Sequence, residues 1–222
     1  MINNFIYAIL ISYAALFPVL NPLGASLLFH SITFPLDQKV KARLARKIAV
    51  NAFVLLTGVL ILGSYVLKLF GIQIPIVQLA GGAVVATRGW MIMNTGVRAT
   101  SSGPTEIISD EKTAFGSAFF PLTLPMSAGP GSIATAITLG AGAEALPDRV
   151  SKLLDYGGLV AGVFFAALTV FFAYHFAGYL MKRLSDNGRI VIMKLSSFIT
   201  LCIGLSIVWK GMQGLIGFYI HP

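Results

Sequence analysis

Two proline-containing segments carry the residues of this sequence that are best suited to binding chemistry. Residues 17–22 and 120–125 share the pattern F-P-x-x-x-P, and helix-interrupting residues follow them closely, N-P-L-G at 21–24 and S-A-G-P-G at 127–131. A proline inside a helix removes one hydrogen bond and crowds the carbonyl four residues earlier. Both segments therefore predict helices that break and leave backbone polar groups unpaired.

These unpaired backbone groups predict a site for a zwitterion. The amino ends of helices attract anionic groups, and the carbonyls freed by the prolines could receive an ammonium group or a cation. The amides expected to be free lie in the first turns of two half-helices, at Leu23, Gly24 and Ala25 and at Gly131 and Ser132. Such a site suits the backbone of an amino acid.

The small side chains around both breaks limit the size of the ligand. The candidate substrate-binding residues are Asn21, Pro22, Leu23, Gly24, Ala25, Thr123, Pro125, Ser127, Ala128, Gly129, Pro130, Gly131 and Ser132. The alternative is that Gly, Ala and Ser only let helices pack closely, which is the interpretation we give to Gly158 and Gly162 in their G-x-x-x-G spacing. We favour a site because matched interruptions in two halves of a membrane protein indicate one.

The elements that hold these segments are predicted to be membrane-spanning helices. The chain of 222 residues is 56% hydrophobic and 11% charged, far below the roughly 25% charge of soluble domains. The runs without Asp, Glu, Lys or Arg are 5–33, 48–67, 74–86 with a continuation to Asn94, 114–142, 159–180 and 195–209. Since a helix needs about 20 apolar residues to cross a bilayer, we predict an all-α, polytopic protein with six spans.

The chain further predicts an inverted repeat. Each F-P-x-x-x-P segment lies in the first span of a half, and each half has three spans, so the halves must enter the membrane from opposite sides. The predicted organisation is one membrane domain over 1–222, with a first repeat at 1–97, a linker at 98–113 and a second repeat at 114–222. Helices 1 and 4 are expected to be discontinuous.

The distribution of charge predicts the orientation. Most basic residues follow the odd-numbered spans: Lys39, Lys41, Arg43, Arg46, Lys47, Arg98, Lys112, Lys182, Arg183, Arg189 and Lys194. By the positive-inside rule these loops are cytoplasmic and both termini lie outside a cell membrane. Attraction to anionic membrane lipid accounts for the net charge of +8, and no nucleic-acid partner is expected.

Energy coupling and the isolated polar residues leave alternatives open. No carboxylate lies deep in a span, so we expect coupling either to Na⁺, held by carbonyls and by the hydroxyls of Thr123, Ser127 and Ser132, or to H⁺ through the substrate or His175. Arg88 is interpreted as an interfacial anchor, with a gate or substrate contact as the alternative. Asn21 caps a half-helix, binds substrate or does both.

A secondary transporter explains these features better than other classes. The sequence has no cofactor motif, no ligand spacing for a metal and no phosphate-binding loop. A channel predicts a continuous polar stripe or a charged ring, which is not found. An intramembrane hydrolase would need a nucleophile with a base, for which Ser127 and His175 are the available pair.

The segments N-P-L-G at 21–24 and P-L-T-L-P-M-S-A-G-P-G-S-I at 121–133 resemble the signature segments of the MarC/SnatA family. The resemblance covers essentially the whole chain. It implies six helices in two inverted halves and transport of small neutral amino acids such as glycine and alanine. It also implies site-forming roles for Asn21, Pro22, Gly24, Thr123, Pro125, Ser127, Gly129, Pro130 and Gly131. Exporters or channels for another small solute remain the alternative.

Overall fold

The structure is a computed structural model that describes residues 2–95 and 107–220. All regular elements in these ranges are helical. They are α1 (Ile2–Leu20), α2 (Pro22–Ile32), α3 (Gln38–Leu69), α4 (Ile74–Thr95), α5 (Glu111–Gly116), the π-helical turn η1 (Leu122–Ser127), α6 (Pro130–Glu144), α7 (Arg149–His175), α8 (Ala177–Arg183) and α9 (Asp186–Ile220).

Five helices of the described ranges are long and apolar enough to cross a membrane. They lie in Asn3–Leu20, Gln38–Leu69, Ile74–Asn94, Arg149–His175 and Asn187–Gly217. The fourth predicted span, 114–142, is instead divided among α5, η1 and α6. Because α6 has 15 residues, it extends only about 22 Å. The first predicted span, 5–33, consists of α1 and the shorter apolar helix α2.

Several helix boundaries differ from the predicted spans for one reason. α3 begins at Gln38 rather than at Ile48, and α9 extends on both sides of the predicted 195–209. Charged residues end an apolar run but do not end a helix, since Lys and Arg are good helix formers. α7 likewise begins before the predicted 159–180, at Arg149, but it ends at His175, where α8 follows it.

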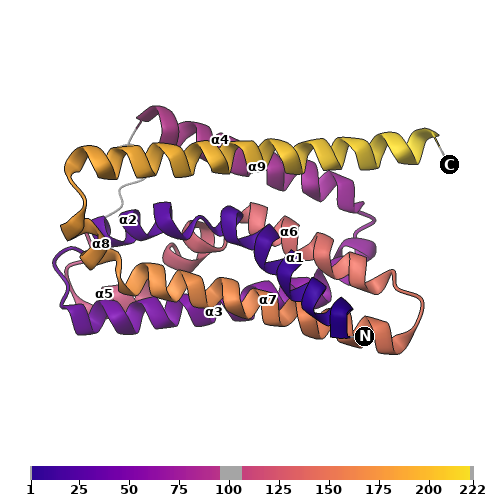
Figure 1. Cartoon of the computed structure of the whole chain (residues 1–222), viewed down its shortest axis with the longest axis horizontal. Coiled ribbons are helices and arrows are strands. Elements are labelled where there is room, and N and C mark those ends of the chain that lie inside the picture. The colour runs from indigo at the N-terminus through magenta and orange to yellow at the C-terminus, as the bar shows by residue number, and fades with distance from the viewer. Residues whose placement is uncertain (1, 96–106, 221–222) are drawn as a thin grey trace.

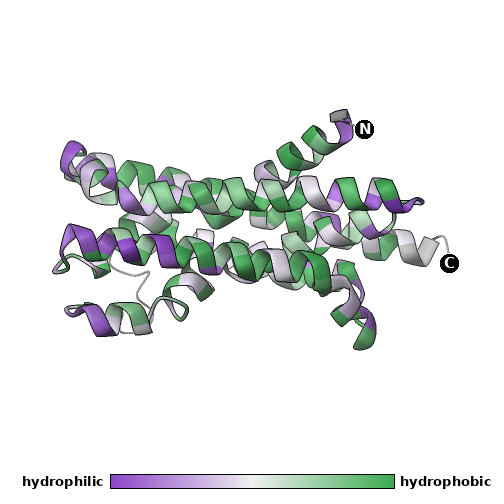
Figure 2. Cartoon of the chain, turned by 90° about the horizontal axis from the view of Figure 1, so that it is seen from below, coloured by the Kyte–Doolittle hydropathy of each residue, from purple (hydrophilic) through white to green (hydrophobic). Residues whose placement is uncertain are grey.

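The long helices lie side by side along the longest axis of the molecule (Figure 1). Both described ends of the chain lie at one end of this bundle. The opposite end holds the last turn of α2, the first turns of α3 and α9, and α8, and we call it the basic end. Hydrophilic residues gather near the ends of the bundle, and its middle is mostly hydrophobic (Figure 2).

Glycines set the closest helix contacts. At Gly158 and Gly162 of α7, an added Cβ would lie 2.6 Å from the Cβ atoms of Ala8 and Ser12 in α1. The prediction that these two glycines serve packing is therefore confirmed. Between α4 and α9, which pack along each other, the glycines that approach the opposite backbone are Gly82, Gly89, Gly204 and Gly211.

Two glycines of α6 provide a matched test of this packing. An added Cβ at Gly140 would lie 1.8 Å from the carbonyl oxygen of Leu60 in α3, whereas one at Gly142 has no neighbour within 4 Å. We expect Gly140→Ala to lower the free energy of unfolding by at least about 1–3 kcal/mol through overpacking. Gly142→Ala should be neutral or stabilising by about 0.5–1 kcal/mol.

Thermal unfolding of the two detergent-purified variants measures this difference. Equal melting temperatures would show that α6 does not approach α3 this closely.

Candidate functional site

The first break lies at Asn21, between α1 and α2. Its backbone is left-handed, with φ 47° and ψ 58°, a conformation that Asn tolerates better than most residues. Its side-chain Oδ1 accepts from the Gly24 amide at 3.1 Å, and its carbonyl accepts from the Ala25 amide at 2.9 Å. The prediction that these two amides are free is therefore wrong, and the expected cap at Asn21 is present.

The second break occupies residues 117–129, where the carbonyls predicted to be free also have partners. The Ser117 and Pro121 carbonyls accept from the amides of Leu122 and Met126, each five residues later, at 3.2 and 3.3 Å. Within η1 only Leu124 has a non-helical backbone, with φ −112° and ψ 121°. This wider hydrogen-bond spacing replaces the bonds that the prolines remove, so the prediction that the prolines leave these carbonyls unpaired is wrong.

Arg88 of α4 holds the second break from the side. Its Nη1 donates to the carbonyl of Pro125 at 2.8 Å and its Nη2 to that of Met126 at 3.1 Å. The side chain is half-buried and turned towards the break. The interpretation of Arg88 as an interfacial anchor is therefore wrong, because its guanidinium satisfies interior carbonyls.

The start of α6 differs from the start of α2 because no side chain caps it. Gly129 precedes the helix and Pro130 occupies its first turn. The Gly129 carbonyl accepts from the Ile133 amide at 3.1 Å. The first-turn residues Gly131 and Ser132 are both buried. No side-chain cap therefore occupies the first-turn amides of this helix.

A small cavity of about 40 Å³ lies between the two breaks. It brings together the predicted site residues Asn21, Gly24, Ala25, Gly129, Pro130, Gly131 and Ser132. On this measure about 10–15 Å³ holds one water molecule. The cavity therefore has room for a few waters, which restricts any solute to the smallest ones.

Six predicted site residues do not line this cavity: Pro22, Leu23, Thr123, Pro125, Ser127 and Ala128. Leu23 is 48% exposed, and Ala128 is fully buried. The hydroxyl of Thr123 donates to the Ala118 carbonyl at 2.7 Å, so it serves the backbone of the break. Pro125 contributes through its carbonyl, which Arg88 binds.

Ser127 lies behind the cavity, in a contact with α7. Its hydroxyl donates to the Leu122 carbonyl at 2.8 Å and shares a hydrogen bond of 2.7 Å with the buried Tyr174 hydroxyl. The Tyr174 ring in turn stacks on Phe29 of α2, with centroids 4.7 Å apart. Ser127 therefore connects the second break to the helix that follows the first one.

The cavity also contains residues that sequence reasoning missed. They are Ser197 and Thr200 of α9, which line the cavity together with Arg88, whose alternative interpretation was a gate or substrate contact. The neighbouring Ser196 donates a short hydrogen bond to the Asn21 Oδ1. The available signal was a group of hydroxyls, S-S at 196–197 and T at 200, one helical turn apart inside an otherwise apolar span.

The helices that leave the cavity give its depth. From the first break, α2 runs 11 residues towards the basic end, which is about 16 Å. From the second break, α6 runs 15 residues in the other direction, about 22 Å. A hydrocarbon core is about 30 Å thick, so the cavity lies near the middle of the apolar part of the bundle.

Within the part of the chain that the structure describes, no group of three or more His, Cys, Asp or Glu side chains lies close enough together to hold a metal ion.

Comparisons with known proteins identify relatives along almost the whole chain. The sequence model of the MarC family integral membrane proteins matches residues 5–216. The UPF0056 membrane protein YvbG of Bacillus subtilis is 26% identical over 97% of this chain and 97% of its own length. The UPF0056 membrane protein MJ0972 of Methanocaldococcus jannaschii is 23% identical over 97% of this chain and 89% of its own length.

The UPF0056 inner membrane protein MarC of Escherichia coli is 27% identical over 96% of this chain and 97% of its own length. No solved structure matches the chain significantly.

Substitutions at Asn21 separate its cap from its backbone conformation. Asn21→Gly removes the side-chain bond to the Gly24 amide but keeps an unstrained left-handed backbone. Asn21→Ala removes the same bond and adds strain of about 1–2 kcal/mol. We expect the Ala variant to melt at the lower temperature in detergent. Equal melting temperatures would show that the left-handed conformation contributes no strain.

Proposed function

The chain belongs to the MarC family of integral membrane proteins, and on that premise we propose that it is a secondary transporter of small neutral amino acids of the glycine and alanine class. The observation that carries this proposal is the small cavity between the two breaks, near the middle of the bundle. Binding sites of secondary transporters are built from interrupted helices at this depth.

The amino end of α6 and Arg88 supply the chemistry for a carboxylate. Gly131 and Ser132 line the cavity at an uncapped helix start, and the Arg88 guanidinium lines the same cavity. Helix N-termini and guanidinium groups both favour negative charge. Arg88 donates one N–H group to each of two carbonyls. A guanidinium has five N–H groups, so others can donate to a carboxylate.

The hydroxyls of α9 supply oxygen atoms for an ammonium group. Ser197 and Thr200 donate their hydroxyl protons to the carbonyls of Met193 and Ser196, so their oxygen lone pairs can still accept. Asn21 lines the same cavity, but its amide oxygen already accepts from the Gly24 amide and from the Ser196 hydroxyl. In this proposal the zwitterion lies between α6 and α9, and the cavity volume of about 40 Å³ excludes large side chains.

We further propose six membrane crossings in two inverted three-helix repeats, 1–97 and 114–222, joined by a linker at 98–113. Crossings 1 and 4 are then discontinuous, formed by α1 with α2 and by α5, η1 and α6. The helix packing supports this assignment, because exchange of the halves maps the contact of α2 with α7 onto that of α6 with α3, and the contact of α1 with α7 onto the contacts of α5 and η1 with α3. The contact between α4 and α9 maps onto itself.

The proposed orientation has the basic end in the cytoplasm and both termini outside the cell membrane. Two observations support it, the location of both described chain ends at the end of the bundle away from the basic end (Figure 1) and the charge bias of the loops.

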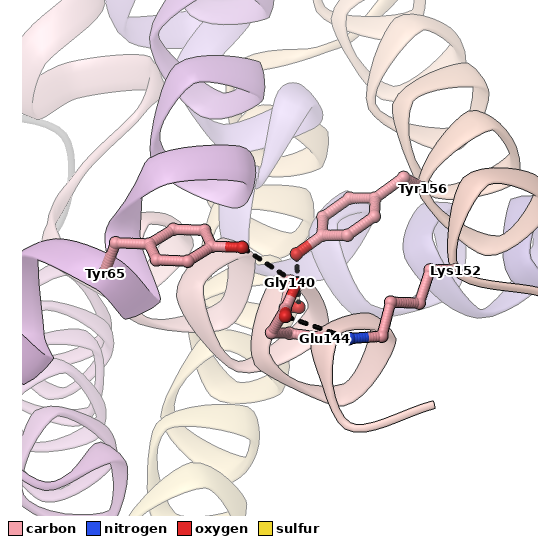
Figure 3. Close-up of polar contacts among 5 residues, drawn as sticks. All are labelled: Tyr65, Gly140, Glu144, Lys152 and Tyr156. Carbon is pink, nitrogen blue, oxygen red and sulfur yellow. Dashed lines mark hydrogen bonds and ion pairs between the residues drawn. The ribbon is translucent and has the colours of Figure 1, made fainter. Parts of the chain in front are cut away.

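At the end opposite the basic end, a polar cluster connects three helices across both proposed repeats (Figure 3). Glu144 at the end of α6 accepts from Tyr65 of α3 at 2.9 Å and from Lys152 of α7 at 3.0 Å. The Tyr156 hydroxyl donates to the Gly140 carbonyl at 3.0 Å. Alternating access requires each end to close in turn, and these bonds are suited to closing the outer one.

Coupling to Na⁺ or to H⁺ remains part of the proposal, with transport in either direction. An exporter or channel for another small solute is the second candidate.

The contacts of Ser127 and His175 do not support the hydrolase alternative. The hydroxyl of Ser127 bonds to Tyr174 and Leu122, while His175 ends α7 with its ring against Phe171 and Phe176.

Uptake by the purified protein in liposomes tests the function. Labelled glycine and alanine are supplied with a Na⁺ gradient, a proton gradient or neither. We expect gradient-dependent accumulation of one or both, with leucine transported much more slowly because the cavity is small. Uptake that depends on neither gradient would contradict coupling. If the folded protein takes up neither glycine nor alanine, the proposed amino-acid substrate is wrong.

Thr200→Val and Thr135→Val form a matched pair for the ammonium site. Both threonines donate to the carbonyl four residues earlier, but of the two only Thr200 lines the cavity. Loss of one hydrogen bond to a charged group, about 1.5 kcal/mol, should raise the half-saturating glycine concentration roughly tenfold in Thr200→Val. Thr135→Val should behave as the unmodified protein. Equal effects of the two changes would place the ammonium group elsewhere.

A further inference from the structure

The small cavity between the two breaks has an apolar wall that the charged groups of a zwitterion do not use. Its hydrogen-bonding groups come mainly from Arg88, the first turn of α6 and the hydroxyls of α9, whereas α1, α2 and the valines of α4 contribute apolar surface. Neutral amino acids share one backbone and differ in their side chains. The apolar wall therefore decides which of them fits.

Val85 of α4 lies directly against the first turn of α6. A Cβ added at Gly131 would lie 1.8 Å from Cγ2 of Val85 and 3.2 Å from Cγ1 of Val19. All three residues line the cavity. Because carbon atoms in contact are about 3.5–4.0 Å apart, no further carbon atom fits between Val85 and Gly131. Val85 therefore forms a boundary of the cavity at the helix end proposed for the carboxylate.

The backbone of α4 is held close to the second break on both sides of Val85. Gly81, Val85 and Arg88 lie on one face of α4, because they are four and three residues apart. One turn before Val85, a Cβ added at Gly81 would lie 2.5 Å from the Cβ of Ala134 in α6. One turn after it, Arg88 donates to two carbonyls of the second break. Val85 cannot withdraw from the cavity without disturbing one of these contacts.

The side chain of Val85 is also stiff. A β-branched residue in a helix has one strongly preferred χ1 rotamer, and Val85 is buried. Met126 and Met193 lie elsewhere on the cavity wall, and methionine side chains adapt to the groups that they contact. A sharp limit on solute size is therefore expected from Val85 and not from the methionines.

On the premise of the proposed amino-acid transport, we propose that Val85 limits the size of the solute side chain, with Val19 as a second, looser contact. A carboxylate at the first turn of α6 lies beside Val85, which contacts Gly131 in that turn. The α-carbon of the solute and its side chain then meet the valine. A hydrogen atom or a methyl group is accommodated there, and an ethyl group is excluded.

Competition for glycine uptake tests this role with the full-length protein in liposomes. Uptake of labelled glycine is inhibited with unlabelled glycine, alanine or 2-aminobutyrate, whose side chain is an ethyl group. Val85→Ala removes two methyl groups from the wall. The half-inhibitory concentration of 2-aminobutyrate divided by that of glycine should then fall roughly tenfold, the effect of one methylene group in a tight pocket. This ratio does not depend on how much of the variant is folded.

Two further variants control for effects on structure. Val163→Ala makes the same deletion in α7, where Val163 is fully buried and does not line the cavity, so its ratio should equal that of the unmodified protein. Val19→Ala should lower the ratio by a smaller factor, because Val19 lies farther from Gly131 than Val85 does. Val19→Ala also tests the same wall if Val85→Ala does not fold.

The outcomes separate this role from the transport itself. An unchanged ratio in the cavity variants, or an equal fall in Val163→Ala, would overturn the role of Val85 and leave amino-acid transport intact. Absence of glycine and alanine uptake by the folded, unmodified protein would instead contradict the proposed function, and the role of Val85 with it.

Discussion

Every backbone amide and carbonyl inside a bilayer must find a partner within the protein, because hydrocarbon offers none. An unbroken helix meets this requirement by itself, but the two interrupted segments of this chain do not. Asn21 meets it at the first break with its own side chain and carbonyl. At the second break, wider backbone bonds, the Thr123 and Ser127 hydroxyls and the Arg88 guanidinium share the task.

The candidate site is a consequence of how these partners are distributed. Where a side chain caps a helix, as at α2, the first-turn amides are no longer open to a ligand. At α6 the residue before the helix is Gly129, so the first-turn amides stay open on the side of the cavity. Glycines also let α4 approach α9 closely, so that Arg88 and the hydroxyls of Ser197 and Thr200 line the same small cavity.

Local sequence features predicted a large part of this architecture. Composition and apolar runs correctly predict a helical membrane protein, and the N-P-L-G segment correctly predicts an interruption at Asn21. The prolines and glycines of 121–131 likewise predict an interruption within 114–142, but they do not predict that this segment forms three short elements, α5, η1 and α6. Apolar runs also underestimate helix length, as α3 shows, since its amino-terminal turns carry charge outside the apolar region.

The role of Arg88 could not be predicted in the same way. Its partners, the carbonyls of Pro125 and Met126, lie more than thirty residues away along the chain, and position within a span does not tell which way a long side chain points. Ser196, Ser197 and Thr200 were missed for the same reason. Their meaning depends on the helix that faces them, and that neighbour is set by tertiary packing.

The polar cluster around Glu144 has a consequence for how a proton gradient could be coupled to transport. Hydrogen bonds from Lys152 and from Tyr65 hold the pKa of this half-buried carboxyl below its ordinary value, so the group keeps its charge from neutral pH into the acidic range. The bonds are lost only when the pH falls through that lowered pKa. Moderate acidity would therefore leave the hydrogen bonds of this cluster in place. In the proposed proton-coupled transporter, the group that takes up the proton would therefore be one other than Glu144.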